Sequence, residues 1–189
     1  MRVQLKNVRL AFADIFQPTD FNGDGNFKFR ATLLIPKNSD AHKAVSDAIK
    51  QVAQETFKEK ADKTLQQIKA ADNLCLRDGD LKDYDGFEGN MSLSATNKAR
   101  PSLFDRDGKT QLVEADGKPY NGCYVNAIVD VYAYTKYGQQ INCSLLGLQF
   151  AADGDAFSAN RPAQAGEFDD LSDQGGSDDD DEGAGAGLI

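Results

Sequence analysis

Residues 122–150 have the sequence GCYVNAIVDVYAYTKYGQQINCSLLGLQF, and the first half of this stretch alternates strictly between two sets of side chains. One set is small or β-branched and comprises Cys123, Val125, Ala127, Val129, Val131 and Ala133. The other set is larger and mostly polar or aromatic: Tyr124, Asn126, Ile128, Asp130, Tyr132 and Tyr134. A period of two over a dozen residues is typical of a β-strand with one buried face. We therefore expect the small aliphatic face to lie in the core and the tyrosine face to lie outside it.

A second strand should return directly from this one. Residues 135–138 have the sequence TKYG, and the apolar run of residues 141–150 follows them. Two strand-like runs joined by a short glycine-bearing segment are typical of a β-hairpin. The hairpin is therefore the element around which the rest of the chain should be arranged.

The other predicted elements fit the same kind of domain. Further strands are predicted over residues 2–13, with a bulge near residues 6–7, and over residues 26–35, 91–96 and 111–114, with a loop over residues 14–26. Ser39 or Asp40 can cap an amphipathic helix that continues to Ala71, with a break near residues 61–62. Several strands and one dominant helix predict a mainly β domain, an antiparallel barrel closed so that no edge is exposed, with the helix as its lid.

The charge of the chain is divided unevenly. The formal net charge is −9, but residues 166–189 contain nine acids and no base. The remaining residues are therefore formally neutral, and the acidic total does not exclude a polyanionic partner. We expect one folded domain over residues 1–160 and a flexible acidic tail over residues 161–189.

Several classes of function find no support in the residues. One histidine and three widely spaced cysteines give little material for a metal site or a disulfide framework. Residues 20–25 resemble the start of a calcium loop, but Ala31 occupies the position of the required bidentate glutamate. No nucleotide-binding or hydrolase motif is present. We expect no enzyme activity, no cofactor and no metal, and the lack of a signal or membrane segment predicts a cytoplasmic protein without a membrane partner.

A binding function has better support. Proteins that hold single-stranded nucleic acid place aromatic rings, on which bases stack, in a groove whose lysines and arginines follow the phosphates. The predicted outer strand faces and loops carry such a mixture, and the candidate binding residues are Phe16, Lys28, Arg30, Lys98, Arg100, Tyr124, Tyr132, Tyr134, Lys136 and Tyr137. Phe21 is a second aromatic residue of the first loop. The alternative is that the tyrosines only cover the sheet beneath the helix.

The acidic tail supplies a second candidate site. It combines a run of acids with an apolar terminus, and its candidate partner-binding residues are Asp178, Asp179, Asp180, Asp181, Glu182, Leu188 and Ile189. A tethered polyanion has an effective concentration on the order of millimolar at any basic groove within its reach. It could therefore occupy the groove when nucleic acid is absent, while the Leu188–Ile189 pair offers an apolar plug for a partner protein. The alternative is a charge run that only keeps the protein soluble.

The chain as a whole resembles a family of phage single-stranded DNA-binding proteins with an OB-fold, long catalogued as a domain of unknown function. The segments that carry the resemblance are VRLAFADIFQP (8–18), FKFRATLLIPKNSD (27–40), NKARPSLFDRDG (97–108), residues 122–150 and DGDAFS (153–158). The resemblance implies an OB-type barrel, sequence-independent binding of single-stranded DNA, no catalysis, and work in phage replication or recombination in the host cytoplasm. The tail is similar to the acidic tails of bacterial and T-odd phage single-strand binders, which contact replication proteins and compete with DNA.

Two other interpretations compete with a DNA-binding one. In the first, the acidic tail mimics DNA and inhibits a nucleic-acid enzyme, and the barrel is a passive scaffold. In the second, the chain is a β-rich virion component that assembles without nucleic acid. Deleting residues 166–189 separates the first from a binder, because the deletion should abolish inhibition by a mimic but strengthen DNA binding by a binder.

Overall fold

The computed structural model of the protein describes residues 1–21 and 23–157. Its elements follow the order β1 (Arg2–Thr19), β2 (Lys28–Pro36), α1 (Asp40–Phe57), η1 (Lys58–Lys60), α2 (Ala61–Ala70), β3 (Leu76–Asp78), η2 (Gly79–Leu81), β4 (Asn90–Asn97), β5 (Ser102–Phe104), η3 (Glu114–Asp116), β6 (Tyr124–Tyr134) and β7 (Gln140–Ala152). The predicted mainly β architecture with a helical lid is confirmed. No helix within the described residues is long and apolar enough to cross a bilayer.

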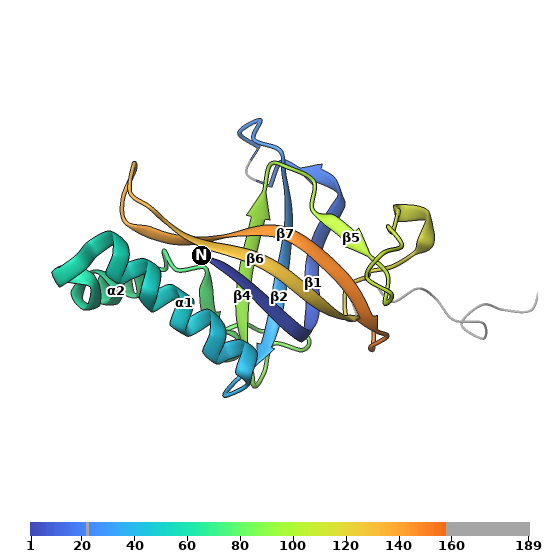
Figure 1. The fold of residues 1–189 in the computed structure, drawn as a ribbon, viewed down its shortest axis with the longest axis horizontal. Helices are drawn as coiled ribbons and strands as arrows, with labels where there is room; N and C mark the ends of the chain where they lie inside the picture. The colour runs from blue at the N-terminus through green and yellow to red at the C-terminus, as the bar shows by residue number, and fades with distance from the viewer. Residues whose placement is uncertain (22, 158–189) are drawn as a thin grey trace, which may run out of the picture.

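The strands form one strongly curved sheet in the order β3-β4-β2-β1-β6-β7-β5 (Figure 1). All neighbours are antiparallel except β5 and β7, which run parallel. The predicted hairpin of β6 and β7 is confirmed. Its small aliphatic face, from Cys123 to Val131, is fully buried, and the alternate positions of β6 are half-buried or exposed.

The sheet is not closed into a complete barrel, which corrects the expected closure. β4 and β7 approach each other at the seam, where Asn97 Nδ2 donates to the Leu145 carbonyl at 3.0 Å. Nearby, the Cys75 amide donates to the Ile141 carbonyl at 2.8 Å. At the seam, the Asn97 side-chain hydrogen bond and the Cys75–Ile141 backbone hydrogen bond thus take the place of a continuous β-ladder. The result is the partly open form that OB barrels adopt.

β1 is longer than the sequence predicts, and its pairing shifts register at three places, the last of them between Asp14 and Thr19. The predicted bulge is confirmed at Asn7, which has a φ of 52°, where the pairing with β6 shifts between Leu5 and Val8. A second shift, in the pairing with β2, follows Ala11, and Phe12 has a φ of 46° there. Residues 14–19, predicted as a loop, continue the strand because Asp14 pairs with Arg30 across the ladder.

The helix covers one side of the sheet, as predicted (Figure 1). The Ser39 side chain caps α1 by accepting a hydrogen bond from the His42 amide at 3.2 Å. The buried face of α1 runs from Val45 to Ala53 and packs into the same core as the strands. The helical axis is interrupted by η1, where Lys58 has a φ of 50°, slightly before the predicted break at residues 61–62.

Candidate nucleic-acid interface

Two hollows on the outer face of β2 and β4 join into one groove. The first has a volume of about 410 Å³ and extends toward the β1–β2 loop. The second has a volume of about 320 Å³ and extends toward the β6–β7 hairpin. Lys28, Ser94 and Thr96 line both hollows, so they lie at the centre of a continuous path. We call this path the groove.

The alternation of the two floor strands places polar side chains in the groove. On β2, Phe29, Ala31 and Leu33 are buried, which turns Lys28, Arg30 and Thr32 outward. On β4, the burial of Leu93 and Ala95 turns Ser94 and Thr96 outward in the same way. The antiparallel register then sets Arg30 opposite Thr96 and Thr32 opposite Ser94. The floor is therefore a mixture of hydroxyl groups and positive charges.

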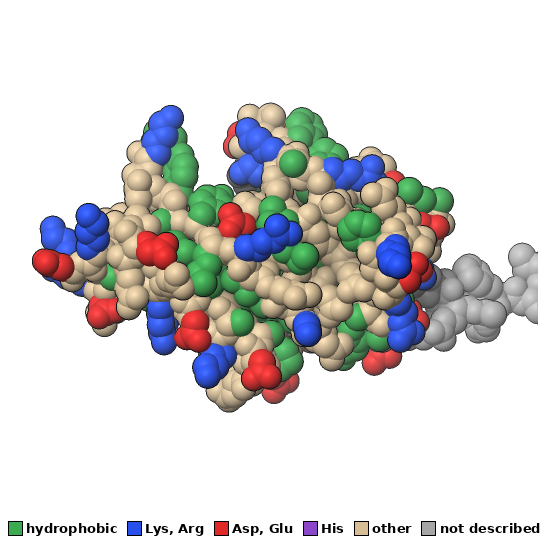
Figure 2. Space-filling model, viewed as in Figure 1, with side chains coloured by type: hydrophobic (Ala, Val, Ile, Leu, Met, Phe, Trp, Pro, Cys, Tyr) green, Lys and Arg blue, Asp and Glu red, His purple; other side chains and the backbone are tan. Residues whose placement is uncertain are grey.

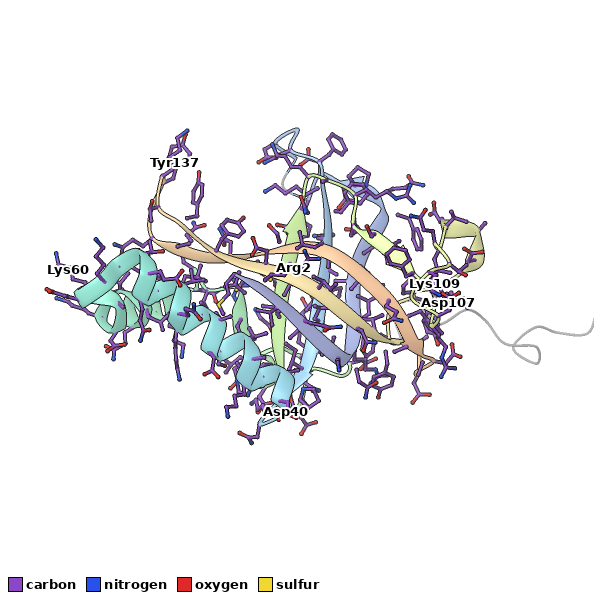
Figure 3. The ribbon with its side chains drawn as sticks, in the orientation of Figure 1. Arg2, Asp40, Lys60, Asp107, Lys109 and Tyr137 are labelled. Carbon is purple, nitrogen blue, oxygen red and sulfur yellow. The ribbon has the colours of Figure 1, made fainter. Side chains whose placement is uncertain are left out.

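One wall of the groove is the β6–β7 hairpin. Tyr132, Gln140 and Asn142 line the groove from this side. At the tip of the hairpin, Tyr137 is 77% exposed and points away from the body of the protein (Figure 3). The Lys136 ammonium lies 5.2 Å from the Tyr137 ring centre, and the Tyr134 and Tyr137 rings lie 6.3 Å apart. The hairpin thus offers aromatic rings next to a positive charge.

The opposite wall is the loop between β1 and β2. Phe21, which is 75% exposed, and Asn26 line the groove from this loop. The Asp20 carboxylate fixes the loop by accepting hydrogen bonds from the Gly25 amide at 2.8 Å and the Asp24 amide at 3.2 Å. The Gly25 hydrogen bond lowers the pKa of Asp20. The calcium-like motif therefore acts as a turn that positions Phe21. Figure 2 shows a deep notch between this loop and the hairpin tip.

The positive charges in the groove differ in their pairing. Arg30 is bound to Asp14, with Nε 2.5 Å from Oδ2, and Arg77 is bound to Asp72 at 2.6 Å. Lys28 makes no ion pair with any residue of the described part of the chain. Lys28 is thus the central charge that an incoming phosphate can neutralise without displacing an internal partner.

The structure brings some of the predicted site residues together. Lys28, Arg30 and Tyr132 line the groove, and Tyr134, Lys136 and Tyr137 extend its hairpin wall. Lys98 and Arg100 are exposed directly after β4 but lie outside the lining of the groove. Phe16 belongs to β1 and not to a loop, and it is half-buried against the main hydrophobic core.

Tyr124 lies apart from the other predicted residues. Its ring centre is 5.9 Å from the guanidinium of Arg9, and it pairs across the sheet with Ala152 near the end of β7. Tyr124 and Tyr132 share a strand face but are eight positions apart, which corresponds to roughly 26 Å along an extended strand. Tyr124 therefore packs at the end of the sheet opposite to the hairpin tip.

Phe21, named from the sequence as an aromatic residue of the first loop, lines the groove. Several other groove residues were not predicted from the sequence: Phe12, Thr19, Asn26, Thr32, Tyr84, Ser94, Thr96, Gln140 and Asn142. The period-two phase that selected Lys28 and Arg30 also identifies Ser94 and Thr96 as outward-facing. No comparable signal identifies Phe12 or Tyr84, because a bulge and a tertiary contact bring them to the groove. The predicted tail residues, from Asp178 to Ile189, lie outside the described residues.

Comparisons with known proteins show which family the chain resembles. Residues 1–182 match the family model described as the ssDNA-binding protein of Enterobacter phage Enc34. Protein p50 of Acyrthosiphon pisum secondary endosymbiont phage 1 is 47% identical over 175 residues, which cover 91% of this chain and 95% of p50. The Enc34 single-stranded DNA-binding protein, solved in complex with ssDNA, superposes with a TM-score of 0.63 at 25% identity, over 83% of this chain and 89% of that one.

A more distant structure shares the fold. The bacteriophage T7 protein gp2.5, a single-stranded DNA-binding protein, superposes with a TM-score of 0.55 at 13% identity, over 86% of this chain and 98% of that one. Since the family model spans nearly the whole sequence, this chain belongs to the family of the single-stranded DNA-binding protein of phage Enc34.

Proposed function

We propose that this protein binds single-stranded DNA in the groove, without catalysis and with little preference for sequence. The observation that carries the proposal is a groove with Lys28 at its centre and aromatic rings on both walls. Single-strand binders combine these two features, because phosphates follow the basic track and bases stack on the rings. Membership of the Enc34 family supports the same function.

The composition of the groove favours binding without sequence preference. Every base presents a π face to an aromatic ring, so stacking on Phe21 or Tyr132 does not depend on which base is bound. The hydroxyl groups of Thr32, Ser94 and Thr96 can both donate and accept hydrogen bonds, so they tolerate different base edges. Duplex DNA hides the faces of its bases and should bind more weakly.

In the infected bacterium, the protein would protect single strands during phage replication or recombination in the host cytoplasm. This role is supported by the phage origin of the relatives that the chain matches. We further propose that the acidic residues Asp178–Asp181 and Glu182 compete with DNA for the groove, and that Leu188 and Ile189 contact replication proteins.

The position of Phe157 supports competition by the tail. Phe157 lies with its ring centre 4.5 Å from the guanidinium of Arg9. It also packs against Gly86, where an added Cβ would lie 2.5 Å from the Phe157 ring. Gly86 is two residues from Tyr84, which lines the groove. The described chain therefore ends beside one end of the groove, and a polyanion tethered at that point would have an effective concentration there on the order of millimolar.

Fluorescence anisotropy with labelled oligo-dT tests the proposal, using full-length protein and a 1–165 truncation at two or more salt concentrations. We expect salt-sensitive binding with a log–log slope of about −0.7 for each neutralised phosphate, tighter binding by the truncation, and weak binding to a duplex of the same length. Equal affinity for duplex and single strands would contradict the proposal. Failure of both proteins to bind would also contradict it and would favour the DNA-mimic interpretation.

A further inference from the structure

An aromatic cluster lies at one end of the groove, outside the strand faces and loops from which the candidate site was predicted. It consists of Phe12, Tyr84 and Phe87, whose ring centres are 5.1 to 5.8 Å apart. Phe87 is 4% exposed and forms the base of the cluster, whereas Phe12 and Tyr84 are 46% and 57% exposed. Both exposed rings line the same hollow as Phe21. Two large aromatic surfaces are therefore presented to the groove.

The backbone of β1 directs Phe12 into this cluster. Phe12 has a φ of 46°, in the left-handed region that a bulky residue rarely occupies. It lies where the register between β1 and β2 shifts, and a bulge of this kind re-aims a side chain relative to the regular alternation. A strained conformation that persists must be held by its surroundings, and such conformations cluster at ligand sites.

The connection that carries Tyr84 is held firmly at both ends. The Asp80 carboxylate accepts a hydrogen bond from the Gly89 amide at 2.7 Å, which closes residues 80–89 into a loop. The Lys37 ammonium lies 2.6 Å from both Asp78 and Asp80 and lowers the pKa of each carboxyl. Phe87 anchors the loop by packing on Ala11 and Leu34. Tyr84 is therefore a prepositioned surface.

The end of the hollow that carries Phe12, Phe21 and Tyr84 fits a base. Its floor presents hydroxyl and amide groups from Thr19, Asn26, Thr32, Ser94 and Thr96. Of the two basic residues in the lining, Arg30 is paired with Asp14, and Lys28 lies where this hollow joins the second one. The volume of the hollow, about 410 Å³, is within the range of about 300–1,000 Å³ for small-ligand sites. Behind Tyr84 lies a separate acidic hollow that includes Asp80, Asp83 and Glu88. Residues 78–89 hold five acids and one lysine, so a phosphate chain that continued past Tyr84 would be repelled.

We propose that the hollow between Phe21 and Tyr84 takes one unstacked nucleobase, the terminal base of the bound strand, with Tyr84 as its stacking platform. The acidic loop turns the phosphate chain away at this point and so sets the end of the DNA footprint. The inference rests on the proposed function and adds to it a defined end of the DNA footprint on the protein. Phosphates are held further along the groove, near Lys28.

The test compares full-length wild type with Tyr84→Ala, Tyr84→Phe and Leu81→Ala in equilibrium binding to oligo-dT. Tyr84→Ala should bind about 5- to 150-fold more weakly, the loss of one base stack, with an unchanged salt slope. Tyr84→Phe keeps the ring and should bind like wild type. Leu81 is 82% exposed in the same connection and does not line the groove, so Leu81→Ala should also bind like wild type.

A scan with abasic sites locates the base that Tyr84 contacts. A single abasic site is placed at each position of a minimal oligo-dT in turn, and each oligonucleotide is titrated with wild type and Tyr84→Ala. We expect the two losses to be non-additive at one position at an end of the footprint and additive elsewhere. Tight binding by wild type with no loss in Tyr84→Ala, or additive losses at every position, would overturn the inference. Failure of wild type to bind any oligonucleotide would instead overturn the proposed function.

Discussion

The guanidinium of Arg30 lies 4.3 Å from the ring centre of Phe21, while its Nε is bound to Asp14. Arg30 is thus occupied on its edge by a carboxylate and on its face by an aromatic ring. Its main role in the groove is therefore to hold Phe21 in place, and the charge available for a phosphate comes from Lys28.

Salt titration distinguishes these two basic residues. Lys28→Ala should reduce the magnitude of the log–log salt slope by about 0.7, because one phosphate contact is lost. Arg30→Ala should weaken binding through the loss of the Phe21 support but change the slope less, because Asp14 already neutralises Arg30. The measurement is the dissociation constant for oligo-dT at four or more salt concentrations. An equal change of slope in both variants would show that Arg30 contacts phosphate directly.

Phe16 and Phe21 should differ in what their removal affects. Phe16 packs against the core and is half-buried, so Phe16→Ala should lower the free energy of unfolding by about 1–3 kcal/mol, less than for a fully buried ring. Phe21 is exposed, so Phe21→Ala should change stability by less than about 0.5 kcal/mol but weaken binding about 5- to 150-fold. Urea unfolding and anisotropy measure the two quantities. Loss of affinity at Phe16 with unchanged stability would refute this division.

Tyr132 and Tyr124 form a matched pair on one strand face. Tyr132 lines the groove, and Tyr132→Ala should weaken oligo-dT binding by about 5- to 150-fold. Tyr124 packs against Arg9 at the other end of β6, and Tyr124→Ala should leave the affinity within about twofold of wild type. The comparison is made on variants that are shown by thermal unfolding to be folded. Equal losses would mean that DNA follows the length of β6 and not the groove.

The core thiol of Cys123 predicts a pH dependence of stability. Burial raises its pKa from 9.0 to about 11. Below pH 9 the thiol is protonated in both states. Between pH 9 and 11 the unfolded chain releases the proton more readily, so the free energy of unfolding falls as the pH rises, by at most about 3 kcal/mol. Cys123→Ala lacks this group and should lose less stability in urea unfolding at pH 10.5 relative to pH 8.5. An identical loss in both proteins would contradict the assignment.

The parts of the fold that follow a local period could be predicted from the sequence. The alternation of residues 123–134 specified which face of β6 is buried, and helical spacing after Ser39 specified the buried face of α1. The bulge at Asn7 was visible as a slip in the alternation of residues 2–13. The continuation of β1 to Thr19 was not, because it depends on pairing with Lys28 and Arg30 across the sheet. The short strands β3 and β5, three residues each, are too short to show a period.

The residues of the candidate site also fall into two groups, those that a local pattern predicts and those that only tertiary contacts place. Lys28, Arg30 and Tyr132 could be selected because strand phase alone turns them outward. Strand phase does not say where along a strand the groove crosses, so Tyr124 was selected with Tyr132. Tyr84 lies in an acidic loop, and tertiary contacts, among them the packing of Phe87 on Ala11 and Leu34, bring it to the groove. Tertiary contacts of this kind leave no local pattern.

The central claim, that single-stranded DNA crosses β2 and β4 between the hairpin and the β1–β2 loop, is tested most directly by photocrosslinking. Oligo-dT containing single 5-iodouracil bases is irradiated with the full-length protein, and the crosslinked residues are identified by mass spectrometry. We expect crosslinks at Tyr132, Tyr137, Phe21 and Tyr84, with Tyr84 reached from one end of the strand. Crosslinks confined to Tyr124, or to the face of the sheet that carries Arg2 and Ile128, would contradict the account.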